Sequence, residues 1–219
     1  MSLAHPLLTG CGVAHGFGLR GDPGPVGVVR PRQVHGVTIA RASANAAPGD
    51  ADAIVSDLPG VPVAVVTADC VPILVASEDG RAVAAVHAGW RGLAAGVVPR
   101  AIDALRKRLP AHAPLRAAVG PCIGACCYEI DRPVIDAMTR RFPDEAAAAL
   151  TPVRAEHARL DLAMLVRVDL ARAGLAREAV GGFEAACTFC DRERFYSYRR
   201  DGAGAGRLLH WIAAGGREA

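Results

Sequence analysis

The sequence has little net charge and no long apolar run. Its formal net charge is +3 over 219 residues, and only residues 195–207 are locally basic. Because proteins that bind duplex nucleic acid usually concentrate basic side chains on one face, we expect no nucleic-acid partner. No apolar run approaches the roughly 20 residues that cross a bilayer, so we expect no membrane partner either. Nothing in the sequence predicts an oligomeric state.

The first residues, MSLAHPLLTGCG, lack the basic and apolar regions of a secretory signal. We therefore expect a cytoplasmic protein. Seven cysteines are present, an odd number. In a reducing compartment this number favours free thiols, either buried or bound to metal, over a disulfide framework.

Internal repeats and long linkers are also missing. An apolar content of 52% with 21% charged residues is enough to bury a sizeable core. We predict a single domain over residues 1–219, of the α+β class, in which helices flank a mixed β-sheet.

The clearest pattern lies in residues 63–92, where VAVVTADC, VPILVASEDG and RAVAAVHAGWRG follow one another. Nearly continuous apolar runs of this length are typical of strands covered on both faces. The turn-forming Glu78-Asp79-Gly80 separates two runs and predicts adjacent strands. Asp69 and Cys70 close the first run and His87 closes the last. This order would bring a thiol and an imidazole to one edge of a sheet.

Other segments give weaker signals. Helical spacing predicts helices over residues 93–109, which Pro99 would kink, over residues 133–142 and over residues 161–173. Short strands are expected at residues 13–17, 26–29, 37–39, 115–120, 180–183 and 208–212. Residues 42–57 are rich in Ala, Asn, Pro and Asp and predict a surface loop.

His35, Cys70 and His87 provide two imidazoles and one thiol from three predicted strand ends. This is a known ligand set for catalytic zinc, which keeps a fourth position for water. The spacing leaves other interpretations open, because a lone Cys or His is often structural. Cys70 would also serve as a nucleophile with His87 as its base, and backbone N–H groups near Gly89 would form an oxyanion hole. That arrangement would make the protein a hydrolase of peptides or peptidoglycan fragments.

Copper is a third interpretation, since two His and one Cys also form a blue-copper set. A laccase-like oxidoreductase needs many more imidazoles than one such set supplies. The sequence has seven His, with no His-x-His pair and no axial Met near the set. Copper is therefore disfavoured against zinc.

The remaining cysteines suggest a second metal site. Cys122 and Cys126 together with Cys187 and Cys190 would form a four-sulfur structural zinc site. Such pairs usually lie on tight turns with Gly nearby, whereas Cys190 is followed by Asp191-Arg192-Glu193. Half-buried thiols are therefore the favoured interpretation here, and Cys127 has no assigned role.

Five ordered motifs resemble the YfiH/laccase-domain family, and together they cover the chain from residue 33 onwards. The motifs are Gln33-Val34-His35, Thr67-Ala68-Asp69-Cys70, His87-Ala88-Gly89-Trp90-Arg91-Gly92, Gly120-Pro121-Cys122-Ile123-Gly124 with Cys127-Tyr128-Glu129, and Cys187-Thr188 with Tyr198-Arg199-Arg200.

The resemblance implies a fold, a cofactor and an activity. Proteins of this family were first labelled polyphenol oxidases and are now described as zinc-dependent purine nucleoside phosphorylases that also deaminate adenosine; some are named peptidoglycan editing factors. The resemblance therefore implies a cytotoxic-necrotizing-factor-like fold and zinc ligands at His35, Cys70 and His87. Adenosine, inosine, guanosine or methylthioadenosine would be cleaved with phosphate to base and ribose 1-phosphate.

Phosphorolysis requires groups that hold a phosphate dianion and the charge developing on the base. Arg199, Arg200 and Arg207 lie among glycines and are the first candidates, because guanidinium binds phosphate bidentately. Arg91, and Arg32 beside Gln33, are the other candidates. A solvated basic hairpin is the alternative interpretation of the arginine-rich segment.

Cys70, His87 and Asp69 are the candidate catalytic residues. In deamination, zinc would lower the pKa of a water that attacks C6 of adenine. Asp69 is the candidate proton shuttle, or else it supports a metal ligand.

The sequence departs from the family before residue 31. His15-Gly16-Phe17-Gly18-Leu19-Arg20 runs almost directly into Gln33-Val34-His35, without the Asn-Leu-Gly-like segment that usually lies between them. We therefore expect a shortened N-terminal part, which affects the wall of the substrate pocket if that segment helps to form it.

Overall fold

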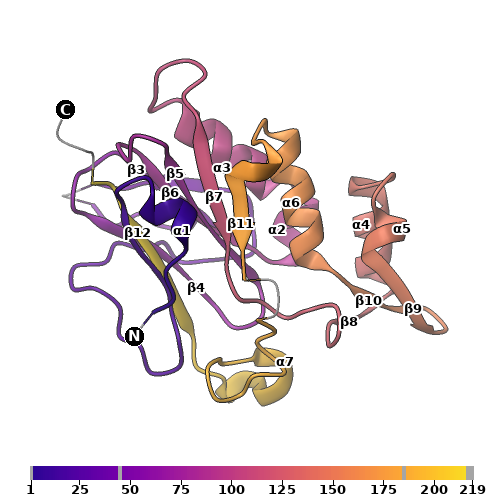
Figure 1. The fold of residues 1–219 in the computed structure, drawn as a ribbon. Coiled ribbons are helices and arrows are strands. Elements are labelled where there is room, and N and C mark those ends of the chain that lie inside the picture. The colour runs from indigo at the N-terminus through magenta and orange to yellow at the C-terminus, as the bar shows by residue number, and fades with distance from the viewer. Residues whose placement is uncertain (1, 44–45, 184–185, 216–219) are drawn as a thin grey trace.

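A computed structural model describes residues 2–43, 46–183 and 186–215. Helices and strands are interspersed along the chain, and the α+β class predicted from the sequence is confirmed (Figure 1). The strands are β1 (Ala14–Phe17), β2 (Ile39–Arg41), β3 (Ala53–Ser56), β4 (Pro62–Thr67), β5 (Val71–Ser77), β6 (Val83–Ala88), β7 (Leu115–Val119), β8 (Glu129–Asp131), β9 (Leu150–Arg154), β10 (His157–Leu160), β11 (Val180–Gly182) and β12 (Leu208–Ala213). The helices are α1 (Pro6–Thr9), α2 (Trp90–Ala94), α3 (Val97–Arg106), α4 (Arg132–Arg141), α5 (Ala146–Ala149), α6 (Leu162–Arg172) and α7 (Tyr198–Asp201).

A six-stranded mixed sheet in the order β11-β7-β5-β6-β3-β2 forms the centre of the fold. Strands β5 and β6 pair antiparallel at its middle, so the adjacent buried strands predicted from residues 63–92 are confirmed. Their turn is closed by the N–H of Gly80, which donates to the Ser77 carbonyl over 2.9 Å. Gly80 has a φ of +72°, a conformation that glycine adopts without strain.

Side chains alternate between two apolar cores along the central strands, as the period of two in a strand requires. Ile73 and Val75 of β5 face a core that includes residues of α3 and α6, whereas Leu74 and Ala76 face a second core. Both faces of the sheet are therefore covered, which explains why these strands are continuously apolar.

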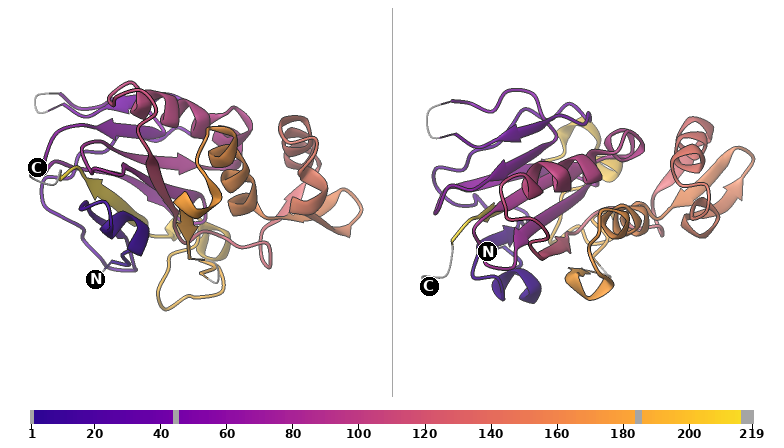
Figure 2. Two further views of the ribbon diagram at one scale, coloured as in Figure 1. Left: turned by 45° about the horizontal axis from the view of Figure 1, so that its top comes forward. Right: turned by 90° about the horizontal axis from the view of Figure 1, so that it is seen from above.

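The second core lies between the central sheet and a smaller antiparallel sheet of β1, β12 and β4. Helix α3 lies across the strands on the opposite side from α1 and β12 (Figure 2). The protein thus has a helical layer, a central sheet and a smaller sheet. A third small sheet, in the order β8-β10-β9, lies with α4 and α5 at one end of the molecule (Figure 1).

The loop predicted over residues 42–57 is wrong in its second half. Residues Ala53–Ser56 form β3, which is fully buried between β2 and β6. Four residues between Asp52 and Asp57 give too short an apolar run to stand out, and the strand exists because its neighbours pair with it. Residues 44 and 45 of the predicted loop lie outside the described residues.

The helix predicted over residues 93–109 is two helices, α2 and α3, which meet at Gly96. The break follows from the φ of +84° at Gly96, while Pro99 lies in the first turn of α3, where its missing N–H costs no hydrogen bond. The strand predicted at residues 26–29 is reduced to a single bridge between Val29 and Val63.

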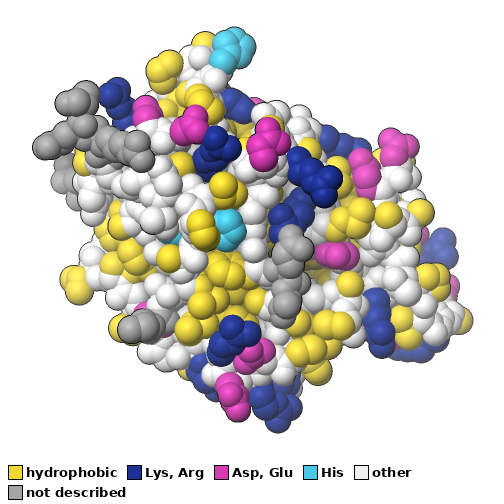
Figure 3. All heavy atoms as spheres, viewed as in Figure 1, with side chains coloured by type: hydrophobic (Ala, Val, Ile, Leu, Met, Phe, Trp, Pro, Cys, Tyr) yellow, Lys and Arg dark blue, Asp and Glu magenta, His cyan; other side chains and the backbone are white. Residues whose placement is uncertain are grey.

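The remaining predicted elements appear close to their expected positions. Helices α4 and α6 correspond to residues 133–142 and 161–173, and β7, β11 and β12 to the expected later strands. No helix within the described residues is long and apolar enough to cross a membrane. On the face drawn in Figure 3, acidic side chains lie among the basic ones, as a low net charge predicts.

Asp169 on α6 generates a prediction about stability and pH. Its side chain is 1% exposed, one carboxylate oxygen accepts from Arg141 over 2.7 Å, and the other has no hydrogen-bond partner among the described residues. Burial raises the pKa of Asp169 to about 6, against the lowering effect of Arg141. The folded state therefore holds a proton that the unfolded state releases, and this contribution to stability is lost as the pH rises from about 4 to about 6.

Asp169→Asn should remove that loss. We expect the free energy of unfolding of the variant, relative to the wild type, to rise by about 1–3 kcal/mol between pH 4 and pH 7 in urea titrations. Asp136→Asn, which removes a charge from the exposed side of α4, is the control. A constant difference between Asp169→Asn and wild type across this range would contradict the prediction.

Candidate functional site

The structure brings His35, Cys70 and His87 together at one end of the central hairpin. Cys70 immediately precedes β5 and His87 lies near the end of β6, and the register that places Pro72 opposite His87 also places Cys70 beside it. His35 comes from the loop before β2. The three potential ligand atoms lie within 4.8 Å of one another, with Cys70 Sγ 3.9 Å from His35 Nε2.

Asp52, which the sequence analysis assigned to a loop, orients two of these residues. Its fully buried carboxylate lies 2.8 Å from His87 Nδ1, which leaves Nε2 as the atom available to a metal. It also accepts backbone N–H groups of Val34, His35 and Gly36, at 3.3, 2.8 and 2.6 Å. A carboxylate behind a histidine fixes the ring orientation and raises its basicity as a ligand.

The electrostatics of this group favour the thiolate. Burial alone would raise the pKa of the Cys70 thiol, but hydrogen bonds and positive charge from His35 and His87 lower it to about 7. Burial would likewise lower the pKa of His87, but its bonds to Asp52 and Cys70 raise it to about 9. The thiolate is the form of cysteine that binds metal and attacks carbon, so both chemistries inferred from the sequence fit this pairing.

The backbone around the ligands is constrained. His35 and Asp69 have φ values of +60° and +95°, conformations that residues with a side chain rarely adopt. Strain of this kind persists where surrounding contacts over-determine the backbone, as at ligand sites. A Cβ on Gly89 would lie 3.0 Å from the His35 ring and 3.1 Å from Cys70 Sγ, so glycine allows the chain to pass beside both.

Asp69 lies beside Cys70, but its carboxylate is engaged elsewhere. One oxygen accepts from the Thr188 hydroxyl over 2.6 Å, and the other accepts from the Ser197 hydroxyl and the Arg199 N–H over 3.0 and 2.7 Å. Three donors to a buried carboxylate hold a loop in place. This geometry favours the supporting role for Asp69 over the proton shuttle, because three of its roughly four acceptor sites are used by the protein.

A cavity of about 790 Å³ opens over the three ligands, which is within the size range of small-molecule sites. It includes nine of the ten residues that the sequence analysis selected and leaves out Arg200. Its lining residues are Arg30, Pro31, Arg32, Gln33, His35, Val66, Thr67, Ala68, Asp69, Cys70, His87, Trp90, Arg91, Ile123, Tyr128, Tyr198, Arg199 and Arg207.

The guanidinium of Arg200 is committed to the protein. It donates to the carbonyls of Thr188, Phe189 and Phe195 at 2.9 Å each and pairs with Asp201, and its side chain is only 8% exposed. All the N–H groups of this guanidinium are bonded within the protein, so the structure favours Arg199 over Arg200 as a phosphate ligand. Sequence alone cannot separate Arg199 from Arg200, because which of two neighbouring side chains faces the pocket depends on α7.

The other selected side chains differ in how free they are. Gln33 is bonded to the backbone, since its amide donates to the Val66 carbonyl over 2.8 Å and accepts the Val66 N–H over 2.7 Å. Arg32 pairs with Asp50 at the rim. Arg199 donates to the Glu129 carbonyl and lies over the Tyr128 ring, and Arg91 lies over Trp90. These two arginines present charge at the mouth of the cavity.

Sequence reasoning missed Asp52 and the pocket residues Arg30, Trp90, Tyr128 and Tyr198 as functional candidates. Trp90 and Tyr128 stood inside motifs that had been quoted for the resemblance, so their signal was available. Asp52 precedes the short apolar run Ala53-Ile54-Val55, whereas Asp69 and Cys70 close a longer run. Its signal is weak because three apolar residues do not predict a strand.

Comparison with known proteins places the chain in a family. A family model described as multi-copper polyphenol oxidoreductase laccase matches residues 20–215. A protein of Xylella fastidiosa named purine nucleoside phosphorylase is 40% identical over 188 residues, covering 83% of this chain and 70% of that protein. Escherichia coli YfiH, named as a purine nucleoside phosphorylase, is 36% identical over 181 residues, covering 82% and 71%.

Solved structures agree with this grouping. A DUF152 protein of Neisseria meningitidis superposes with a TM-score of 0.78 at 40% identity, over 86% of this chain and 75% of that one. Bacillus licheniformis YfiH superposes with a TM-score of 0.82 at 26% identity, over 92% of each chain. The chain therefore belongs to the laccase-domain family that includes the YfiH proteins, and the resemblance stated from its motifs is confirmed.

The Asp52 contacts generate a prediction about metal affinity. Asp52→Asn keeps the shape of the side chain but replaces one acceptor oxygen with an NH2 group, which cannot accept a hydrogen bond. Some of the bonds to the His87 ring and to the backbone N–H groups are therefore lost. We expect metal affinity to fall about 10- to 100-fold, measured by competition with a chromophoric chelator. Asp57→Asn is the matched control, because Asp57 pairs with Arg41 and Arg108 away from the site. Equal affinities in the two variants would remove Asp52 from the metal site.

Proposed function

Starting from membership of this family, we propose that the protein is a zinc-dependent purine nucleoside phosphorylase. It would cleave purine nucleosides with phosphate to the free base and ribose 1-phosphate. The observation that carries the proposal is the meeting of His35, Cys70 and His87 beneath a cavity of about 790 Å³ with arginines and aromatic rings in its wall. The relatives named as purine nucleoside phosphorylases support the choice of reaction.

The donor set supports zinc as the metal. Two imidazoles and one thiolate suit zinc with an open fourth position, and the Asp52 carboxylate behind His87 is a common support for such a site. A bound zinc supplies a Lewis acid next to the substrate. The family description names copper, but within the described residues only two imidazoles meet at this site. Multinuclear copper chemistry requires more, so zinc remains the proposal.

The residues around the metal site suit the two parts of the reaction. Trp90, Tyr128 and Tyr198 offer aromatic faces on which a purine can stack. Arg199, Arg91 and Arg207 offer guanidinium groups for a phosphate dianion, with Arg30 and Arg32 at the same cavity. Phosphate then attacks the anomeric carbon of the ribose, the bond to the base breaks, and donors in the cavity stabilise the negative charge on the leaving base.

The proposal extends to the substrates that the sequence analysis named. Adenosine, inosine and guanosine share the purine and ribose that the cavity is proposed to hold. Methylthioadenosine has a methylthio group in place of the 5′-hydroxyl of that sugar, and its product is the corresponding methylthioribose 1-phosphate. Adenosine deaminase activity is included, because a metal held by His35, Cys70 and His87 would activate water for addition at C6 of the purine, from which ammonia then leaves.

A Cys–His hydrolase acting on peptides or peptidoglycan fragments is the second candidate. The observation in its favour is the Cys70 thiol, whose pKa is lowered to about 7 by two imidazoles. A thiolate beside an imidazole is the starting arrangement for nucleophilic catalysis. The two candidates differ in what Cys70 does, because a nucleophile is dispensable for metal binding and a ligand is not.

Cys70→Ala and His87→Ala should each remove one zinc per chain and abolish turnover, since two remaining ligands hold the metal too weakly. Zinc content is measured by elemental analysis, and products of a nucleoside panel with and without phosphate by mass spectrometry. His157→Ala is the control and should change neither. If Cys70→Ala retains all its zinc but is inactive, Cys70 acts as a nucleophile and the hydrolase replaces the phosphorylase. Stoichiometric copper in the wild type would instead favour an oxidoreductase.

The arginines generate a separate prediction. Arg199→Ala should raise the KM for phosphate at least about tenfold, or about 1.4 kcal/mol, because one charge-assisted contact is lost while zinc content is unchanged. Arg200→Ala should instead lower the melting temperature, because it leaves three carbonyls and Asp201 without their donor. Arg132→Ala, on the exposed surface of α4, is the control for loss of charge. An unchanged KM in Arg199→Ala would move the phosphate to Arg91 or Arg32.

A further inference from the structure

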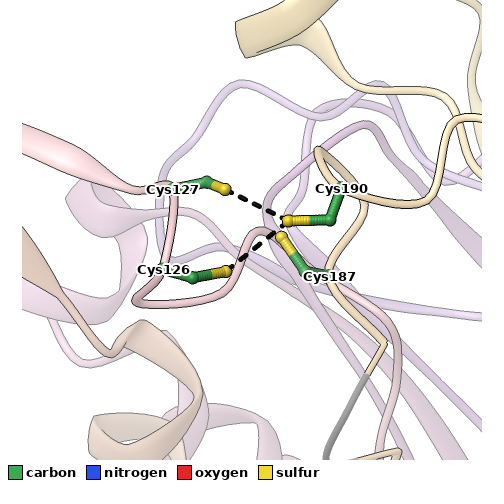
Figure 4. A group of neighbouring side chains, drawn as sticks. All are labelled: Cys126, Cys127, Cys187 and Cys190. Carbon is green, nitrogen blue, oxygen red and sulfur yellow. Dashed lines mark hydrogen bonds between the residues drawn. The ribbon is translucent and has the colours of Figure 1, made fainter.

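Four cysteine thiols outside the proposed active site converge on one point (Figure 4). Cys126 and Cys127 lie in the loop between β7 and β8, and Cys187 and Cys190 lie in the loop between β11 and α7. Their four Sγ atoms lie within 4.8 Å of one another. Cys190 Sγ is 3.3 Å from Cys127 Sγ and 3.7 Å from Cys126 Sγ.

This set differs from the four-sulfur set expected from the sequence in one member, because Cys127 takes the place of Cys122. Cys122 is 7% exposed and belongs to the apolar core beneath the helices. Its carbonyl accepts the Thr188 N–H over 2.9 Å, so its contribution to joining the two loops comes from the backbone. Spacing alone favoured Cys122, since a pair separated by three residues resembles a metal-binding turn more than two adjacent cysteines do.

The structure supplies the tight turns and the nearby glycine that the sequence around Cys190 does not show. The N–H of Gly124 donates to Cys187 Sγ over 3.3 Å, and the N–H of Cys190 is directed at the same sulfur. A Cβ on Gly124 would lie 3.3 Å from Cys126 Sγ, so glycine lets the first loop approach the sulfur atoms. The Asp191 N–H donates to the Cys187 carbonyl over 3.1 Å and closes the turn that carries Cys187 and Cys190.

We propose that Cys126, Cys127, Cys187 and Cys190 bind one zinc ion as a closed four-thiolate structural site. Four sulfur atoms around zinc at about 2.3 Å form a tetrahedron with edges of about 3.8 Å, which falls within the separations observed here. Four thiols lose their protons to solvent as four Zn–S bonds form, and no oxidant is needed. One disulfide would account for only two of the four sulfur atoms, which favours the metal.

The site would fasten the first loop, which contributes Ile123 and Tyr128 to the cavity wall, to the second loop, which leads into α7 with its wall residues Tyr198 and Arg199. The first loop reaches Asp69 through the Ile123 N–H, which donates to the Asp69 carbonyl over 3.0 Å. The second reaches it through the Thr188 hydroxyl, which donates to the Asp69 carboxylate over 2.6 Å. Asp69 directly precedes Cys70, so a metal joining the loops would hold the strained backbone beside the active-site thiolate. The proposal itself does not depend on the reaction catalysed there.

Elemental analysis of protein purified under reducing conditions without added metal tests the site. The Cys187→Ser/Cys190→Ser variant should contain one zinc per chain less than the wild type, whatever the site at His35 holds. Cys122→Ala is the matched control and should keep the wild-type zinc content. Equal zinc in the double variant and the wild type would overturn the proposal, as would loss of one zinc in Cys122→Ala with retention in the double variant.

A measurement on the unmodified protein covers the case in which the double variant does not fold. Cys126 and Cys190 are exposed, so a metal-free site would alkylate quickly. We expect both thiols to resist iodoacetamide at least about tenfold better before a strong zinc chelator is added than after, as followed by peptide mass spectrometry. Rapid alkylation without chelator would contradict the proposal. Protection that a reductant relieves and a chelator does not would indicate a disulfide instead and would also overturn it.

Cobalt binding and thermal stability test the four-thiolate site and its effect on the loops without a measurement of zinc content. In a Cys70→Ala background, where the first site is disabled, cobalt added to the chelated protein should give intense thiolate-to-cobalt charge-transfer absorption and raise the melting temperature. Adding Cys190→Ser to that background should abolish both changes. Absorption that persists without Cys190 would exclude the four-thiolate site.

Discussion

The carboxylate of Asp52 is the contact on which the geometry of the site depends. It is buried between the end of β6 and the loop that carries His35, and it accepts from the His87 ring and from three successive backbone N–H groups. Removing such a group from water is costly unless its oxygens are satisfied, and here four donors satisfy them. The same contacts hold His35 at a positive φ and leave His87 Nε2 directed towards Cys70. One buried charge therefore orients two ligands that lie 52 residues apart in the sequence.

Asp69 plays the corresponding part on the other side of Cys70. Its three donors come from the segment between Thr188 and Arg199, so the last third of the chain is anchored to the residue before the thiolate. The two carboxylates thus fix the loop before β2 and the loop before α7 against the same hairpin. Because both carboxylates are buried and accept several hydrogen bonds, they support the backbone around the site.

The cavity combines the proposed metal ligands His35, Cys70 and His87 at its base with guanidinium groups and aromatic rings in its walls. A purine nucleoside is flat and apolar on its faces, whereas phosphate is a compact dianion, so the two substrates need different surfaces in one space. Arg199 and Arg91 each lie against an aromatic ring, which places charge and stacking area side by side. This arrangement is the reason that one pocket suits both partners of the proposed phosphorolysis.

The sequence by itself determined the β5–β6 hairpin, the family, and the choice of His35, Cys70 and His87 as three side chains that meet, because each depends on a local pattern. Continuous apolar runs predict buried strands, and the residues that end those runs meet when the strands pair. It did not reveal β3 and therefore missed Asp52, because four buried residues between two aspartates lack a period of their own. Nor did the sequence show which of Arg199 and Arg200 lines the cavity, or which of Cys122 and Cys127 joins the other three thiols. Residues close together in a loop have similar sequence surroundings and differ in the direction of their side chains. Only the tertiary structure decided these points, because the direction of each side chain is set by backbone contacts with segments 60 to 130 residues away.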